Sequence, residues 1–164
     1  MIPDEDGDVV YPSAVFFPQN GDNPWIGTKA ARRAQHYPET TVYDSKRMLC
    51  KKIDDENIQK LIPNWPFELD STPNGEIQYK IGEVERYSPE DISQFILEHI
   101  RRSSNAFGHN NKLNTVRLEN CIITVPAYFD DAQINATKKA ALKAGFRCNE
   151  TLREPVAAAL SLGL

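Results

Sequence analysis

The sequence predicts an α/β fold, and three features carry that prediction. Residues 121–164 alternate an apolar run, an alanine-rich helical pattern, a short extended stretch and a second helical pattern, which is typical of a parallel crossover unit. Residues 67–87 hold three short apolar runs divided by Pro-Asn-Gly and Gly-Glu, which indicates a small antiparallel meander. Between these two regions, a long helical pattern begins at Ser88.

Length and composition fit a single globular unit. The chain has 164 residues, enough for one domain with its own core. Hydrophobic residues make up 40 % and charged residues 26 %, a globular balance. The net charge of −4 leaves no strongly basic surface, so we expect neither a nucleic acid nor a membrane as a partner. No apolar run reaches the roughly 20 residues that a membrane span needs.

The three cysteines bear on the compartment. Cys50, Cys121 and Cys148 are far apart in the sequence and form no CxxC pattern of a metal or redox site. Their odd number and the polar start of the chain, MIPDEDGD, favour a reducing compartment. We therefore expect a cytoplasmic location, with the nucleus as the alternative.

The first half of the chain predicts short elements, because turn residues and prolines interrupt every apolar run. In chain order these are an edge strand pair at residues 9–17, a helix at 29–35 capped by Thr28, an extended stretch at 40–43, a helix at 45–50 capped by Asp44, and a helix at 55–61.

The second half predicts longer elements. The meander strands cover residues 67–69, 77–81 and 84–87, and a helix capped by Ser88 runs to about Phe107, where Gly108 stops it. The apolar run at 121–125 has the composition of a strand covered on both faces. The next helix begins at Asp131, ends at Gly145 and turns Ala136, Thr137, Ala140, Ala141 and Ala144 inward; a last helix covers 156–162.

Three residues stand where α/β folds place their chemistry. Lys46 is near the start of a helix, and its ammonium suits a phosphate or a polarised water, although an ordinary surface lysine is the alternative. Pro126 turns the chain off the sheet at the edge where such folds bind ligands, or simply terminates the strand. Glu154 lies at a helix N-terminus, where a carboxylate stays ionised and can orient metal-bound water, or merely favours the helix start.

The stretches around these residues resemble one family. TVYDSKRML (41–49), ITVPAYFDDAQINATKKAALKAGF (123–146) and REPVAAALSLGL (153–164) resemble the ATPase domain of the seventy-kilodalton heat-shock chaperones, the DnaK-like family. YPSAVFF, WPFEL and SPEDIS also fall in the family's order. The resemblance covers essentially the whole chain.

The resemblance implies an actin-like ATPase with two lobes, each built on a ribonuclease H-like sheet, and with ATP and Mg²⁺ in the cleft. Residues 1–164 match part of the first lobe of this nucleotide-binding domain and none of the substrate-binding domain. Lys46 matches the lysine that acts at the γ-phosphate and the attacking water. Glu154 matches the acid that orients Mg²⁺-bound water, so no residue here is a direct metal ligand. Pro126 matches the proline that relays the nucleotide state to the substrate-binding domain.

The family's phosphate loops fall outside the matched stretch. Members begin with a β-hairpin whose glycine- and threonine-containing turn cradles the phosphates, and this chain starts after it. The second phosphate loop and the metal-site aspartate come after Leu164. We therefore expect a first lobe lacking its N-terminal β-hairpin, with a bare edge on the strand at 121–125. We expect neither secure ATP binding nor hydrolysis by this chain alone.

Three residues depart from the family pattern. Ile134 stands where an arginine usually couples the lobe to the next domain, and Glu150 where an arginine helps receive the J-domain cochaperone. Arg153 replaces the asparagine before the glutamate. These departures predict weakened contact with J-domain cochaperones, which are family partners together with nucleotide-exchange factors. Lineage drift without functional consequence is the alternative.

Two functions follow as hypotheses. The first is an ATP-dependent protein-folding chaperone, represented here by an incomplete ATPase domain. The second is a non-catalytic module, a truncated paralogue that binds proteins and turns over nothing. An unrelated small α/β binding protein is a third interpretation, which predicts a structure without a ribonuclease H-like half-sheet. Whether the chain is an enzyme is left open by its sequence.

Overall fold

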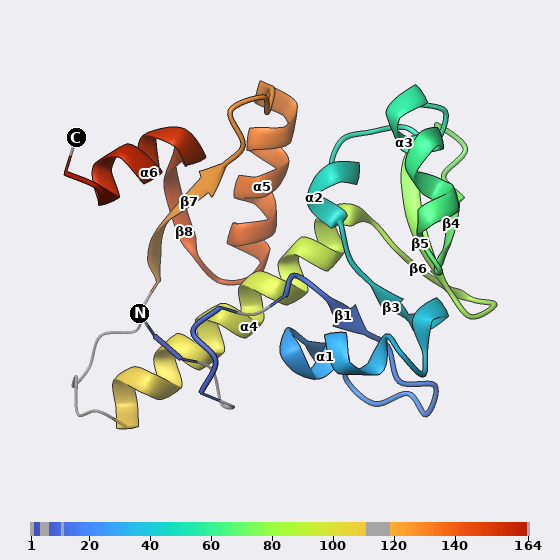
Figure 1. The fold of residues 1–164 in the computed structure, drawn as a ribbon, viewed down its shortest axis with the longest axis horizontal. Coiled ribbons are helices and arrows are strands. Elements are labelled where there is room, and N and C mark those ends of the chain that lie inside the picture. The colour runs from blue at the N-terminus through green and yellow to red at the C-terminus, as the bar shows by residue number, and fades with distance from the viewer. Residues whose placement is uncertain (1, 4–6, 11, 111–118, 164) are drawn as a thin grey trace.

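The computed structural model describes residues 2–3, 7–10, 12–110 and 119–163, and it confirms the α/β class. Figure 1 shows two groups of elements joined by one long helix, α4 (Pro89–Asn110). The first group holds β1 (Val15–Phe16), β2 (Trp25–Ile26), α1 (Thr28–Arg33), β3 (Thr41–Val42), α2 (Ser45–Met48), α3 (Glu56–Leu61), β4 (Glu68–Ser71), β5 (Ile77–Ile81), β6 (Glu85–Tyr87) and single 3-10 turns at Pro38–Thr40 and Ile62–Asn64. The second holds β7 (Asn120–Val125), α5 (Asp131–Lys143), β8 (Arg147–Arg153) and α6 (Glu154–Ser161).

The first strand is much shorter than the sequence predicts. The expected strand pair at residues 9–17 is wrong, because among the described residues of that range only Val15–Phe16 form a strand. That strand lies between β2 and β3 in an antiparallel sheet. Pro12 and Pro18 flank it, and a proline has no N–H to donate to a ladder.

Of the three predicted caps, one is wrong, one is confirmed only in its position and one is confirmed in full. Gly27 precedes α1 and Thr28 is its first residue, without a side-chain cap. Asp44 does precede α2, but it has φ 60° and its carboxylate caps no N–H group. The cap at Ser88 is confirmed, since its hydroxyl accepts a hydrogen bond from the backbone N–H of Asp91 at 3.1 Å.

Helix α4 serves both groups of elements. Its buried Ile92 and Ile96 belong to the main core, which lies between the meander, β1, β3 and the short helices α2 and α3. The next residue, Leu97, packs against a second cluster formed by Ala141, Ala144 and Phe146. Gly108 lies inside α4 and does not stop it, because one glycine in a last turn costs only about 1 kcal/mol.

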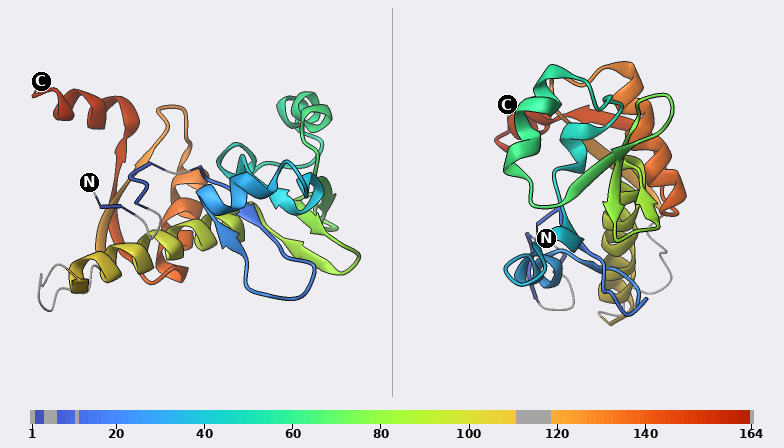
Figure 2. Two further views of the ribbon diagram at one scale, coloured as in Figure 1. Left: turned by 60° about the horizontal axis from the view of Figure 1, so that its bottom comes forward. Right: turned by 90° about the vertical axis from the view of Figure 1, so that its right-hand side faces the viewer.

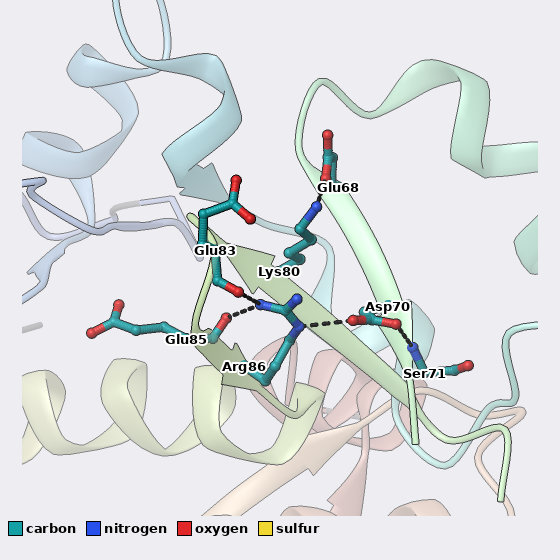
Figure 3. A network of polar contacts seen from close by, with 7 residues as sticks. All are labelled: Glu68, Asp70, Ser71, Lys80, Glu83, Glu85 and Arg86. Carbon is teal, nitrogen blue, oxygen red and sulfur yellow. Dashed lines mark hydrogen bonds and ion pairs between the residues drawn. The ribbon is translucent and has the colours of Figure 1, made fainter. Parts of the chain in front are cut away.

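The meander β4–β5–β6 is antiparallel as predicted. Its exposed face carries two ion pairs across strands, Lys80 to Glu68 at 2.7 Å and Arg86 to Asp70 at 2.8 Å. Figure 3 shows how Arg86 also donates to the backbone oxygens of Glu83 and Glu85. This network holds the meander together at the end of the molecule away from α6, as Figure 2 shows.

Strands β7 and β8 form the predicted parallel crossover with α5 between them. A capping box between Asp130 and Gln133 starts α5, and Gly145, with φ +87°, follows its end. The prediction that β7 is covered on both faces is wrong, because its side chains alternate and Ile122 is 65 % exposed. Within the described residues, only β8 pairs with β7 and α5 packs on one face. The four alanines predicted to face inward from α5 are buried, and Thr137 is only half-buried.

Candidate functional site

The structure brings the three predicted site residues to one cavity of about 730 Å³. Lys46 comes from α2, Pro126 from the turn after β7, and Glu154 from the first position of α6. More than a hundred residues separate Lys46 from Glu154 in the sequence. Their convergence therefore depends on the tertiary fold and not on local spacing.

Hydrogen bonds at both ends of α2 hold Lys46 in place. At the first end, the indole N–H of Trp65 donates to the Asp44 carboxylate at 3.1 Å, which explains why that carboxylate does not cap the helix. At the other end, the buried Gln133 side chain donates to the backbone oxygen of Leu49 at 3.2 Å. The short helix is thus tied to the meander region on one side and to α5 on the other.

The Pro126 turn is held by Arg153, which the sequence marks only as a departure from the family pattern. Nη1 of Arg153 donates to the backbone oxygens of Pro126, Ala127 and Phe129 at 3.0, 3.2 and 2.7 Å. Arg153 is opposite Val125 in the parallel register, so the last residue of β8 clamps the turn that follows β7. No sequence signal marks this contact, because its acceptors are backbone atoms.

Lys46 and Glu154 form an ion pair across the cavity, with Nζ 2.5 Å from Oε1. Their side chains are 51 % and 45 % exposed, so water screens the pair. An exposed pair of this kind is worth at most about 1 kcal/mol. An entering anion or hydrated cation can therefore separate the two groups at small cost.

The remaining lining combines polar groups with an apolar wall. The cation Arg47 and several hydroxyl groups line the cavity, and the apolar side is formed by alanines, Ile96 and Leu97; the hydroxyl residues are Ser13, Thr41, Tyr43, Ser45, Ser93, Thr124, Tyr128 and Thr137. An ammonium, a guanidinium and hydroxyl groups suit phosphate oxygens. The apolar wall leaves room for a less polar part of a ligand.

A hydrated Mg²⁺ ion fits this donor set better than a directly ligated metal. The described residues contain no group of three or more His, Cys, Asp or Glu side chains that could hold a metal ion. Mg²⁺ keeps several waters and takes few protein carboxylates, so Glu154 alone is enough to orient one of those waters. No glycine among the described residues lines the cavity, so these residues do not build a glycine-rich phosphate cradle.

The two other departures lie outside the cavity lining. Ile134 is partly buried and packs on a small cluster that contains Leu49, Val125, Phe129 and Ala136. Glu150 is exposed on β8. Neither position carries a positive charge that a partner protein could use. No helix among the described residues is long and apolar enough to cross a membrane.

Comparisons with known proteins identify the family of the chain. The family model described as Hsp70 protein matches residues 1–164. The chain is 38 % identical to a ribosome-associated molecular chaperone of Zygosaccharomyces rouxii, with 100 % of this chain and 26 % of that protein aligned. It is 35 % identical to the mitochondrial heat shock 70-related protein 1 of Leishmania major, covering 100 % and 25 %. The chain thus spans about a quarter of the length of these relatives.

Proposed function

This chain belongs to the Hsp70 family, and on that premise we propose that it supplies part of an ATP and Mg²⁺ site to an ATP-dependent protein-folding chaperone. The proposed unit is part of the first lobe of an actin-like, ribonuclease H-like ATPase domain. The observation that carries the proposal is the meeting of Lys46, Pro126 and Glu154 at one cavity.

In this proposal Lys46 and Glu154 exchange their mutual contact for contacts with the ligand. The Lys46 ammonium binds the terminal phosphate oxygens and the nearby attacking water. The Glu154 carboxylate accepts a hydrogen bond from a metal-bound water and fixes its direction. Mg²⁺, when bound, neutralises phosphate charge, and phosphoryl transfer otherwise needs mainly positioning and electrostatic stabilisation.

Pro126 and Arg153 form the proposed relay. Pro126 is buried beside the cavity, and its carbonyl oxygen accepts from Arg153, the residue directly before Glu154. A shift of Glu154 toward a hydrated metal ion would therefore move the Arg153 clamp and the Pro126 turn together. The conformational change would thus reach the backbone of residues 126–129, which Arg153 contacts.

A titration of the isotope-labelled chain with Mg·ATP, followed by nuclear magnetic resonance, tests the proposal. We expect saturable shifts at the amides around Lys46, Pro126 and Glu154, because the method detects binding in the millimolar range. Lys46→Ala should weaken the affinity about 10- to 100-fold, the worth of one charge-assisted hydrogen bond. Lys80→Ala is the matched control, since it breaks a lysine–glutamate pair far from the cavity and should leave the affinity unchanged.

The second candidate is a non-catalytic protein-interaction module. Two observations favour it: the apolar strand β7 has an exposed face, and Ile134 is packed in an apolar cluster instead of offering a charge. This candidate predicts no shift with Mg·ATP at any concentration. It would then replace the ATP-site proposal.

Partners and location are proposed on the same family basis. The partners are J-domain cochaperones and nucleotide-exchange factors, with J-domain binding weakened by Ile134 and Glu150. Restoring arginine at both positions should then strengthen binding to a J-domain, measured by calorimetry. The proposed location is the cytoplasm or the nucleus, which cell fractionation would test.

A further inference from the structure

Two thiols lie side by side on the parallel strands, outside the cavity lining. Cys121 is on β7 and Cys148 is on β8, and both are free thiols. In the register, Asn120 is opposite Arg147 and Ile122 is opposite Glu150, with an irregularity between them. Cys121 on β7 therefore lies opposite two residues of β8, Cys148 and Asn149. Two residues opposite one is the arrangement of a β-bulge.

Both side chains lie on the same face of the strand pair, within reach of each other. Cys121 and Cys148 pack against one apolar cluster, formed by Ala141, Ala144 and Phe146. Neighbouring strands are about 4.8 Å apart, which falls inside the ~4.4–6.8 Å between Cα atoms that a disulfide spans. Burial, followed by the neighbouring Cys148 side chain, raises the pKa of the Cys121 thiol to about 11, in keeping with the proximity that the register gives.

The Cys148 side opens to a cationic hollow of about 490 Å³. Its lining includes Lys138, Lys139 and Arg147. An ion pair with Glu119 at 3.4 Å offsets part of the Arg147 charge, whereas the hydrogen-bond partner of Lys138 is the neutral backbone oxygen of Asn149. A sulfur beside such a surface is accessible to small anionic reagents, which the lysines attract.

We propose that Cys121 and Cys148 form a reversible disulfide by exchange with an anionic low-molecular-weight disulfide such as glutathione disulfide. The Cys148 thiolate attacks one sulfur of the reagent, whose S–S bond breaks and releases one glutathione thiolate. Cys121 then gives its proton to solvent and attacks the Cys148 sulfur, and the second glutathione thiolate leaves. Two protein thiols are oxidised to one disulfide while one glutathione disulfide is reduced to two glutathiones.

The different surroundings of Cys121 and Cys148 determine which thiol attacks the glutathione disulfide first. Cys121 is protonated at neutral pH because of its raised pKa, so it is a poor first nucleophile. Once Cys148 carries glutathione, Cys121 is held next to the sulfur that it must attack. The disulfide would tie β7 to β8, whose other ends carry Pro126 and Glu154. The inference does not rest on ATP binding.

Mass spectrometry of the full chain in glutathione redox buffers tests the inference. Non-reducing digestion of Cys50→Ser should yield one cross-linked peptide pair that joins Cys121 to Cys148, and reduction should release it. Cys121→Ser should accumulate a glutathione adduct on Cys148. Cys148→Ser should react at least about tenfold more slowly at Cys121, given its low thiolate fraction.

A denatured sample supplies the control for proximity. In urea the wild-type chain should give a mixture of all three cysteine pairings, whereas the folded chain should give the Cys121–Cys148 pair. The oxidised folded chain should also melt up to about 10 °C higher than the reduced one, because the cross-link closes a loop of roughly 27 residues. The inference is overturned if the folded chain gives the same mixture as the denatured chain, or only separate glutathione adducts.

Discussion

Replacing Arg153 with alanine tests the clamp on the Pro126 turn. Three backbone oxygens lie within 3.2 Å of Nη1, but this nitrogen carries only two hydrogens, so at most two full hydrogen bonds are lost. The bonds to Pro126 and Phe129 are partly buried, and the contact with Ala127 is exposed. A bond from a charged donor is worth about 1.5–3 kcal/mol, and solvent exposure places the pair at the lower end.

We therefore expect Arg153→Ala to lower the free energy of unfolding by about 2–3 kcal/mol, measured by urea denaturation. For a chain of this length the melting temperature should fall by about 5–10 °C. Arg153→Lys should recover less than half of the loss, because an ammonium lacks the planar fork of the guanidinium. Arg102→Ala is the control: the Arg102 side chain is 73 % exposed, and its pair with Glu98 should be worth no more than about 0.5 kcal/mol. Equal losses for Arg153→Ala and Arg102→Ala would refute the clamp.

Three further substitutions test the supports around the site. Asp130→Ala removes the capping box of α5 and should cost about 1 kcal/mol in urea denaturation; no change would mean that the cap is dispensable. Gly145→Ala should cost about 1–2 kcal/mol, because φ is +87° and the new Cβ would approach Nε of Arg101 to 2.9 Å; calorimetric melting measures it, and a stabilised variant would contradict the backbone argument. Burial raises the pKa of Asp91, but hydrogen bonds with Ser88 and a nearby lysine outweigh it and lower the pKa below 3.8. The stability that Asp91 contributes is thus present above about pH 3.8 and lost as pH falls through the folded pKa. Melting curves should show a shallower acid slope for Asp91→Asn, and an unchanged slope would contradict this assignment.

The crossover unit could be predicted because its signals are local. A continuous apolar run marked β7, an alanine-rich helical pattern marked α5, and a glycine after the end of α5 marked the return to β8. The prediction that both faces of β7 are covered was wrong. An apolar run shows that a strand can be buried, but it does not show which elements pack against each of its faces. Ile122 is exposed since α5 packs on the opposite face only.

The short elements of the first half were harder to predict. Prolines limit β1 to two residues, and only tertiary pairing with β2 and β3 fixes where it lies. Asp44 has the composition of a helix cap, but its carboxylate accepts from Trp65, which is 21 residues away. Local propensity does not include such a partner.

The site could be predicted in part. Lys46, Pro126 and Glu154 were identified from their surroundings and from family resemblance, and they do line one cavity, although their roles stay predictions. Arg153 was missed as a clamp because its partners are backbone oxygens 24 to 27 residues away. The Cys121–Cys148 contact was missed for the same reason, since only the strand register brings the two thiols together.

A crystal structure of the chain with Mg²⁺ and a non-hydrolysable ATP analogue tests the central claim most directly. We predict that the terminal phosphate lies between Lys46 and Glu154, with Nζ within hydrogen-bond distance of a phosphate oxygen. The 2.5 Å contact between Nζ and the Glu154 carboxylate should be separated, and a water should bridge that carboxylate to the metal. Phosphates bound elsewhere, or an unchanged Lys46–Glu154 pair beside a bound nucleotide, would contradict the account.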